Sequence, residues 1–233
     1  MYRKMSNIKN KYNCNNKSIL SYLCLFILFF CTSAKSQNNM FLEQIEGRTI
    51  ERENYNDKGD LLNKQLFEAG KITKKKDYYE IKVTTTLYDK NKTLKEKYTT
   101  TYKCEPEKFS IVLFVFPFAD PKSKETEIST KSINFKELYN IEKLENVDLD
   151  ISFDSGLMNF FGSKSTIKIY DRKKEINNRS LSIKSKISIK AYAFGIRIKQ
   201  LNYSLTEKLN SNGLLTYQKF IENDGSYFTM LYK

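Results

Sequence analysis

Apolar and polar residues alternate along much of this chain with a period of two, which is typical of strands with one buried face. In residues 79–87, for example, Tyr, Ile, Val and Leu share one face with a threonine, while Glu, Lys and Thr occupy the other. No stretch of about 11 residues or more shows the 3.6-residue period of an amphipathic helix. The pattern predicts an all-β fold. Further runs lie at residues 94–104, 167–169, 181–191, 196–198, 214–220 and 227–232.

Turn signals separate these runs and predict how they are joined. Residues 55–61, 88–94 and 209–215 each place Asn or Asp early in the turn and Gly or Lys where a left-handed backbone conformation would help. Such turns connect hairpins through a type I turn followed by a bulge. After Gly195 the apolar parity changes, which predicts a turn or bulge there. Successive hairpins predict an antiparallel meander forming a curved sheet or open barrel.

Two segments depart from the alternation. Residues 109–118 are almost continuously apolar and predict a strand buried on both faces, ended by Pro117. Residues 119–165 follow with little pattern, although residues 135–144 suit a short helix. We interpret 119–165 as a long irregular connection, helix or loop, inside a single domain.

The first residues have the composition of a secretory signal peptide. Residues 1–18 are basic, residues 19–31 are apolar, and small residues follow. The apolar stretch is short for a membrane-spanning helix, which needs about 20 residues. We expect cleavage between Ser36 and Gln37, with cleavage after Ala34 as the alternative.

This interpretation defines residues 1–36 as the signal peptide and 37–233 as one exported β domain. The bulky Phe30 disfavours lipidation at Cys31, and whether Met5 is the true start is left open. Cleavage removes six basic residues and no acidic one, which lowers the formal charge from +13 to +7. Of the four cysteines only Cys104 remains, so the exported domain forms no internal disulfide.

The absence of histidine restricts the chemistry more than any other feature of the composition. It excludes histidine-based triads, histidine general bases and histidine metal sites. Cys104 has no histidine to activate it and is expected to pack in the core. Phosphate-cradling glycine loops are also missing. We therefore expect no catalytic residue, no metal site and no cofactor.

Two short motifs resemble catalytic sequences without their usual context. Asp154-Ser155-Gly156 has the form of an aspartic protease loop, but one copy would require a homodimer, and the same tripeptide is common in turns. Ser165 and Lys168 match the Ser-x-x-Lys motif, which requires a helix, whereas this segment alternates as a strand. A carboxylate-based hydrolase is thus the least favoured function.

Acidic and basic residues in alternating segments are interpreted as solvated faces. Asp148 and Asp150, with Asp154, predict a strand with an acidic outer face rather than a calcium loop. Lysines lie near one predicted turn and along one predicted strand, and the alternative to solvation is weak attraction to anionic lipid or polysaccharide. We expect no nucleic-acid partner, and membrane contact only through the transient signal peptide. These lysines are Lys71, Lys74, Lys75, Lys76, Lys184, Lys186 and Lys190.

The turn at 55–61, the Tyr-Lys-Cys end of a hairpin at 102–104 and the closing segment 209–220 together resemble the TapB-like family of exported bacterial proteins of unknown function. The resemblance implies a curved antiparallel sheet or open barrel in the cell envelope and implies no reaction. Sixteen Tyr and sixteen Phe without Trp could pack a core or line an apolar pocket. We therefore predict an exported envelope protein, periplasmic, outer-envelope associated or secreted. Its expected activity is non-enzymatic binding of an apolar or anionic envelope component without a cofactor. The alternative is a structural or protein-interaction domain without a small ligand.

Overall fold

The computed structural model describes residues 45–106, 125–130, 142–153, 164–177, 180–193 and 195–233. The chain divides into two units, residues 1–36 and 37–233, and every described residue lies in the second. The predicted signal peptide, its cleavage position at Ser36 and Gln37, and the apolar run 109–118 lie outside the described residues. Within the described ranges, no helix is long and apolar enough to cross a membrane.

The described residues form eleven strands, and long hairpins dominate. Three consecutive strands of 14 residues each, β7 to β9, make the longest continuous ribbon. The strands are β1 (Thr49–Tyr55), β2 (Leu61–Lys74), β3 (Tyr79–Asp89), β4 (Leu94–Cys104), β5 (Glu125–Thr130), β6 (Val147–Phe153), β7 (Lys164–Asn177), β8 (Ser180–Ala193), β9 (Ile196–Leu209), β10 (Leu215–Glu222) and β11 (Tyr227–Tyr232).

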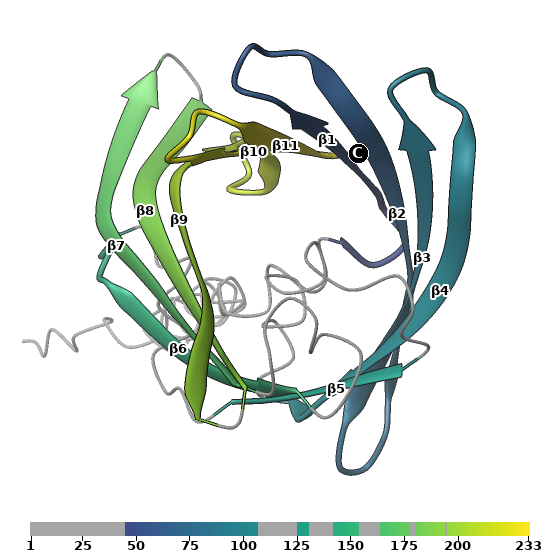
Figure 1. The fold of residues 1–233 in the computed structure, drawn as a ribbon. Helices are drawn as coiled ribbons and strands as arrows, with labels where there is room; N and C mark the ends of the chain where they lie inside the picture. Colours follow the sequence, from purple (N-terminus) through teal and green to yellow (C-terminus); the bar gives the residue numbers. More distant parts are fainter. Residues whose placement is uncertain (1–44, 107–124, 131–141, 154–163, 178–179, 194) are drawn as a thin grey trace, which may run out of the picture. The chain divides into compact units, whose positions relative to one another are not determined.

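The strands close into a barrel in the order β1-β11-β10-β9-β8-β7-β6-β5-β4-β3-β2. Figure 1 shows them as a ring, with β1 and β11 side by side. Every neighbouring pair is antiparallel except β4 and β5, which are parallel. A ring in which all neighbours are antiparallel needs an even number of strands, so one parallel pair allows eleven strands to close. The predicted all-β class and meander are confirmed, and the barrel is closed and mixed.

The alternation of apolar and polar residues gives a strand one buried and one exposed face, as a closed barrel requires. On β6 and β7 the isoleucines and leucine of one face are buried, while Asp148, Asp150 and Lys168 on the other face are exposed. In a barrel the buried face of each strand points inward and the exposed face outward. Because β1 and β11 pair over six residues, the first and last strands leave no seam open for another chain to pair with.

The three predicted turns have the expected geometry. In the first, the side-chain oxygen of Asn56 accepts hydrogen bonds from the backbone N–H groups of Lys58 and Asp60, and Gly59 has a φ of 84°. The β1–β2 register shifts at Asn54/Tyr55, which is the predicted bulge. Asp89 and Asn210 begin the other two turns in the same way. Gly195, with a φ of 78°, lies in the turn between β8 and β9, as the parity change predicted.

The interpretation of residues 119–165 as an irregular connection is corrected where the structure describes them. That range contains β5, whose sequence Glu-Thr-Glu-Ile-Ser-Thr carries one apolar residue, and β6. Sequence alternation could not reveal β5, because its placement depends on pairing with β4 and β6. The acidic strand predicted at Asp148 and Asp150 is confirmed as β6, while Asp154 lies outside the described residues.

Candidate functional site

Strand β1 carries three consecutive charged residues that point to different sides of the barrel. Arg52 shares the inward face with Ile50, which is completely buried, whereas Glu51 and Glu53 point outward. Within the register, Arg52 lies opposite Met230 of β11 and Gln65 of β2. An arginine inside a barrel is costly to bury unless other groups satisfy it, so its surroundings define a candidate site.

A cluster of aromatic rings from three strands lies on one side of this arginine. The Arg52 guanidinium carbon lies 3.9 Å from the centre of the Phe228 ring, in a cation–π contact. Phe228 stacks on Phe220 with 4.4 Å between ring centres, and Tyr203 meets both rings edge-on at 5.9 and 6.0 Å. These contacts give the arginine one apolar side and fix the plane of its guanidinium group.

Polar side chains complete the cluster. Arg52 Nε donates a hydrogen bond to Asn54 Oδ1 at 2.9 Å, and Asn54 Nδ2 donates to Asn63 Oδ1 at 2.6 Å. On β10, Glu222 lies two residues after the inward Phe220, in register with Tyr203, and these two side chains are hydrogen-bonded. The site thus combines one cation, one carboxylate, two carboxamides and three aromatic rings.

Burial changes the titration of the charged and phenolic groups here. It lowers the pKa of Arg52 to about 10, against smaller opposing effects of Tyr203, Glu222 and Tyr98. For Tyr203, burial raises the pKa first, and the charge and hydrogen bond of Glu222 raise it further. At neutral pH the arginine remains charged and the tyrosine remains a hydroxyl that can donate or accept.

A second inward network lies on the same strands, near the opposite ends of β9 and β11. Gln218 Nε2 donates to Glu207 Oε1 at 2.8 Å, and the Tyr232 hydroxyl donates to Gln218 Oε1 at 2.5 Å. All three residues are buried. Burial, followed by the charge of Glu207, raises the pKa of Tyr232. One carboxamide therefore links a buried carboxylate to a buried phenol.

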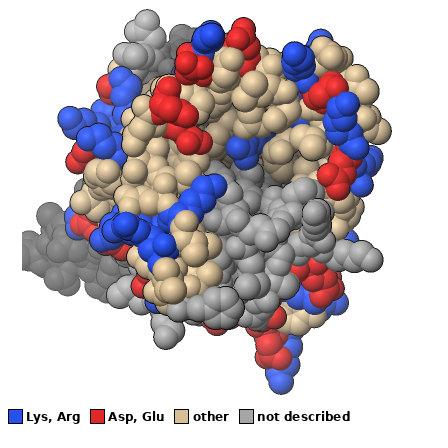
Figure 2. Space-filling model, viewed as in Figure 1, with Lys and Arg blue, Asp and Glu red and all other residues tan. Residues whose placement is uncertain are grey.

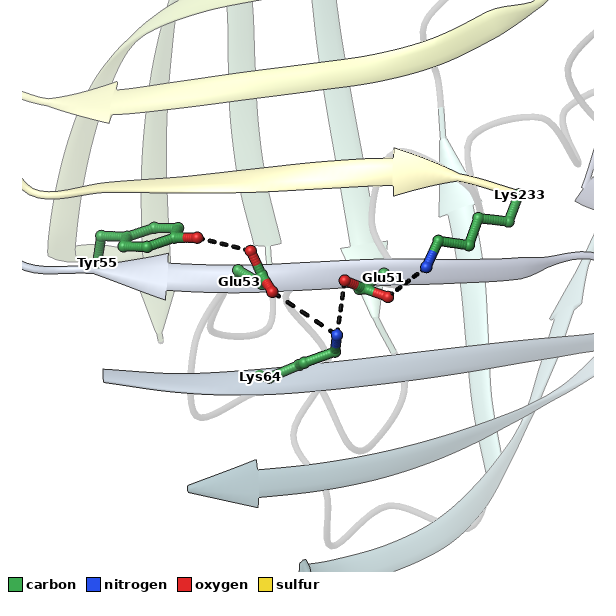
Figure 3. A network of polar contacts seen from close by, with 5 residues as sticks. All are labelled: Glu51, Glu53, Tyr55, Lys64 and Lys233. Atoms are coloured by element: carbon green, nitrogen blue, oxygen red, sulfur yellow. Dashed lines mark hydrogen bonds and ion pairs between the residues drawn. The ribbon is translucent and has the colours of Figure 1, made fainter. Parts of the chain in front are cut away.

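The outward residues of β1 form a separate network, which Figure 3 shows. Glu51 accepts from Lys64 and Lys233, each at 2.6 Å, and Tyr55 donates to Glu53 at 2.6 Å. Burial alone would raise the pKa of Glu51, but the hydrogen bonds from Lys233 and Lys64 outweigh it and lower the pKa. This network ties β1, β2 and the last residue together on the outer surface.

The residues that the sequence analysis singled out do not gather at either inward cluster. Cys104 is buried in the core, as predicted. Ser165 is fully buried on β7, whereas Lys168 points outward to Asp148 at 3.3 Å, so the Ser-x-x-Lys motif has its two members on opposite faces. Asp154, Ser155 and Gly156 lie outside the described residues.

The predicted lysine faces are exposed, and ion pairs neutralise part of them. Lys184 pairs with Glu175 and Lys186 with Asp171, both at 2.9 Å. Lys71, at the β2–β3 end of the barrel, is exposed together with its neighbours Lys74, Lys75 and Lys76. Across the described residues, no group of three or more Cys, Asp or Glu side chains is placed to hold a metal ion.

Sequence analysis did not identify Arg52, Glu222 or Glu207 as site residues. Arg52 stands in the run Thr-Ile-Glu-Arg-Glu-Asn-Tyr, in which charged residues occupy both faces. Ile50, which is apolar, lies two residues before Arg52, so the alternation assigns Arg52 to the same, buried face. This alternation is the sequence signal that could have identified Arg52. Its contact with Phe228 joins residues from opposite ends of the chain, and that proximity depends on closure between β1 and β11.

Figure 2 looks into the ring from one end and shows this face hollowed, with basic atoms visible inside the hollow as well as around the rim. The basic atoms inside are surrounded mainly by uncharged surface, in contrast to the mixed charges around the outside.

Comparisons with known proteins assign no family. No family model and no curated protein matches the chain. Solved structures that resemble it include a proposed lipoprotein from Parabacteroides distasonis, with a TM-score of 0.41 and 13% identity over 81% of this chain and 94% of that one. A proposed exported protein with a YmcC-like fold from Bacteroides fragilis has a TM-score of 0.40 and 12% identity, over 80% and 94%. The resemblance to the TapB-like group stays a prediction.

Proposed function

We propose that this chain is an exported, non-enzymatic module of the cell envelope that binds an apolar or amphipathic component inside its barrel. The observation that carries this proposal is the closed ring of eleven described strands with an apolar inner face. Aliphatic side chains dominate the inward positions of β6 to β8, and β9 to β11 add four buried aromatic rings, those of Tyr203, Phe220, Phe228 and Tyr232. A surface of this kind favours ligands with an apolar body.

The number of strands supports an interior with room for a ligand. About eight strands give a barrel that its own inward side chains can fill, and wider barrels enclose more space. Eleven-stranded barrels are wide enough to surround a central segment. Many inward residues here are also modest in size, including Ala69, Ala191, Ser165 and Thr100. The alternative function, a structural domain without a small ligand, requires this space to be filled by the chain itself.

The basic segment and the apolar segment at the start of the chain support export. An exported protein would meet its ligand in the cell envelope. Residues 1–36 have the order of a signal peptide, and no described group has the arrangement of a histidine-dependent or metal-dependent catalytic site. The outer face is strongly charged, with lysines and carboxylates side by side. Apolar binding is therefore best supported on the inner face.

The test is saturable binding of the uncharged fluorescent probe N-phenyl-1-naphthylamine to the purified protein. We expect enhanced, blue-shifted fluorescence with one site per chain. Replacing Ala191, an inward residue that is 2% exposed, by Trp would occupy part of the interior and lower probe affinity by about tenfold or more. The outward neighbour Lys190→Trp is the matched control and should leave affinity unchanged.

The same pair of variants distinguishes the alternative. A filled interior cannot accept the larger side chain without strain, so Ala191→Trp would then destabilise the fold by about 1–3 kcal/mol. Absence of saturable probe binding, together with that loss of stability, would refute the binding proposal and favour the structural domain. Native mass spectrometry of the purified protein provides a second measurement, by detecting a co-purified lipid.

A further inference from the structure

The hairpin of β8 and β9 extends past the strand that follows it. β9 pairs with β8 from Ile196 onward, but among the described residues its pairing with β10 begins only at Tyr203. Figure 1 shows β9 continuing beyond β10. Residues 195–200 are all exposed, so both faces of the strand are in contact with solvent at this end.

Two isoleucines make the end of this hairpin apolar. Ile196, which directly follows the turn at Gly195, is 69% exposed, and Ile198 is 52% exposed. Neither belongs to the buried core. Large aliphatic side chains that gather in water at one place are typical of a surface that docks on a partner or a membrane.

Basic side chains lie just behind the isoleucines, on the outward face of three adjacent strands. Lys164 of β7 and Arg197 of β9 both lie in register with Tyr192 of β8, one row behind Ile196. Lys190 lies two rows further along β8. In the part of the chain that the structure describes, none of these three cations forms an ion pair; Arg197 donates a hydrogen bond to an uncharged carboxamide, 3.0 Å away.

Acidic residues are scarce around this end of the barrel. Residues 180–206, which include all of β8 and most of β9, contain five basic residues and no Asp or Glu. On β6, Asp148 pairs with Lys168 at 3.3 Å, and Asp150 lies opposite Thr166. The hairpin end therefore combines exposed apolar side chains with an excess of positive charge.

We infer that this hairpin end docks on the surface of a bilayer that contains anionic phospholipid. Ile196 and Ile198 enter the boundary between headgroups and acyl chains, and the three cations contact phosphate groups. Since a strand rises about 3.3 Å per residue, these cations lie about 3–10 Å behind Ile196. Amphipathic helices enter the same boundary to a depth of about 5–10 Å. This contact belongs to the folded domain, in addition to the one expected of the signal peptide, and does not rest on binding inside the barrel.

The local structure favours a lipid surface over a strand of another protein. The β8–β9 register shifts at Ala191/Tyr192, because Arg197 lies opposite Tyr192 and Lys199 opposite Ala191, which leaves Ile198 as the extra residue of a bulge. Bulges and basic side chains on an edge strand hinder the addition of another strand. A lipid surface requires no hydrogen-bond ladder, and anionic headgroups attract basic residues.

The experiment is co-sedimentation of the purified exported protein with vesicles of equimolar phosphatidylcholine and phosphatidylglycerol, and with vesicles of phosphatidylcholine alone. Each basic residue near an anionic surface contributes about fivefold in affinity. We expect binding to the anionic vesicles to be about tenfold or more tighter, and to weaken at high salt. All variants share the same first 40 residues, so any contribution of residues 1–36 is constant.

Matched variants test the apolar part. Ile196→Ser should weaken binding to the anionic vesicles by about fivefold or more, because one aliphatic side chain no longer leaves water. Adding Ile198→Ser should weaken it further. Ile176→Ser is the control, since this isoleucine is 72% exposed and lies near the opposite end of β8, in register with Leu181. It should leave the affinity unchanged.

A second pair of variants tests the cations. Lys164→Gln/Lys190→Gln should weaken binding to the anionic vesicles by about tenfold or more. Lys184→Gln/Lys186→Gln removes the same number of charges from positions that pair with Glu175 and Asp171, and should weaken binding much less.

Several results would overturn the inference. The unaltered protein could bind neither kind of vesicle, or both equally well. Equal losses in the two lysine pairs would show attraction to the whole basic face rather than to this end. Full affinity in Ile196→Ser would leave a purely electrostatic contact, such as an anionic polysaccharide also makes. A dimer that Ile196→Ser dissociates, without vesicle binding, would identify a second copy as the occupant. None of these results changes the binding of N-phenyl-1-naphthylamine, which tests the barrel interior separately.

Discussion

The two faces of β1 place similar charged residues in different environments. On the outer face, Glu51 and Glu53 meet Lys64, Lys233 and Tyr55 in a partly solvated network. On the inner face, Arg52 lies among aromatic rings and carboxamides. Exposed ion pairs contribute little to stability, and a buried ion often costs more than its partners return. The outer network is thus readily explained as part of the surface, whereas the inner arginine calls for a functional explanation.

The largest expected contrast is between two neighbouring aromatic residues of β11. Phe228 points inward, is 3% exposed, and stacks on both Phe220 and Arg52, whereas Tyr227 points outward and stacks on Tyr55 with 4.7 Å between ring centres. Phe228→Ala should lower the free energy of unfolding by about 3–5 kcal/mol. Tyr227→Ala should lower it by about 1 kcal/mol or less. Urea unfolding followed by tyrosine fluorescence measures both, and equal losses would contradict the assigned faces.

A smaller effect is expected from the second inward network. Gln218→Leu removes the carboxamide that links Glu207 to Tyr232 and should cost about 1–3 kcal/mol, because it leaves buried polar groups without that partner. The double variant Gln218→Leu/Tyr232→Phe should regain part of this loss, since it also removes one of those groups. Lys219→Leu on the outer face is the control. If the double variant instead lost the sum of the two single losses in free energy of unfolding, the three residues would not act as one network.

The same difference between faces explains what the sequence could predict. Alternation predicted most strands, and the Asn-x-x-Gly and Asp-x-x-Lys turns predicted the bulges correctly. Strands and turns of this kind depend on residues that are close together in the sequence, so a local pattern can reveal them. Strand β5 and the parallel β4–β5 pair depend on contacts between distant segments, and no local pattern specifies them. Arg52 was missed for the same reason: the ring that its guanidinium contacts, Phe228, lies far away in the sequence and approaches only when the barrel closes.

The outer network should respond weakly to substitution and strongly to salt. Lys64 lies 2.6 Å from Glu51 and 3.6 Å from Glu53, and all three side chains keep partial contact with solvent. Lys64→Met should cost about 0.2–1 kcal/mol in low salt. That difference should largely disappear at about 1 M salt, where screening acts over about 3 Å. A loss that is independent of salt would indicate that the aliphatic part of Lys64, rather than its charge, supports the strand pair.

The smallest effect concerns the protonation of Glu51. Burial would raise its pKa, but hydrogen bonds from Lys233 and Lys64 lower it below the ordinary value of 4.5. A carboxylate whose pKa is lower in the folded state stabilises the protein above its unfolded pKa, and this contribution is lost as the pH falls through the folded pKa. The unaltered protein should therefore exceed Glu51→Gln in stability near pH 7, by less than about 1 kcal/mol. The difference should shrink below about pH 4.5.

Repeating that comparison in the Lys64→Met/Lys233→Met background isolates the cause. Both lysines that lower the pKa of Glu51 are then absent and burial, which raises this pKa, remains, so the pH dependence of the Glu51→Gln difference in the free energy of unfolding should reverse its sign. A dependence that keeps its original sign without the lysines would assign it to the backbone surroundings of β1 instead. Because no inward residue changes in these variants, the affinity of the protein for N-phenyl-1-naphthylamine should stay constant throughout the series. A constant affinity would separate the outer network, which stabilises the seam of the barrel, from the inner face, to which we assign binding.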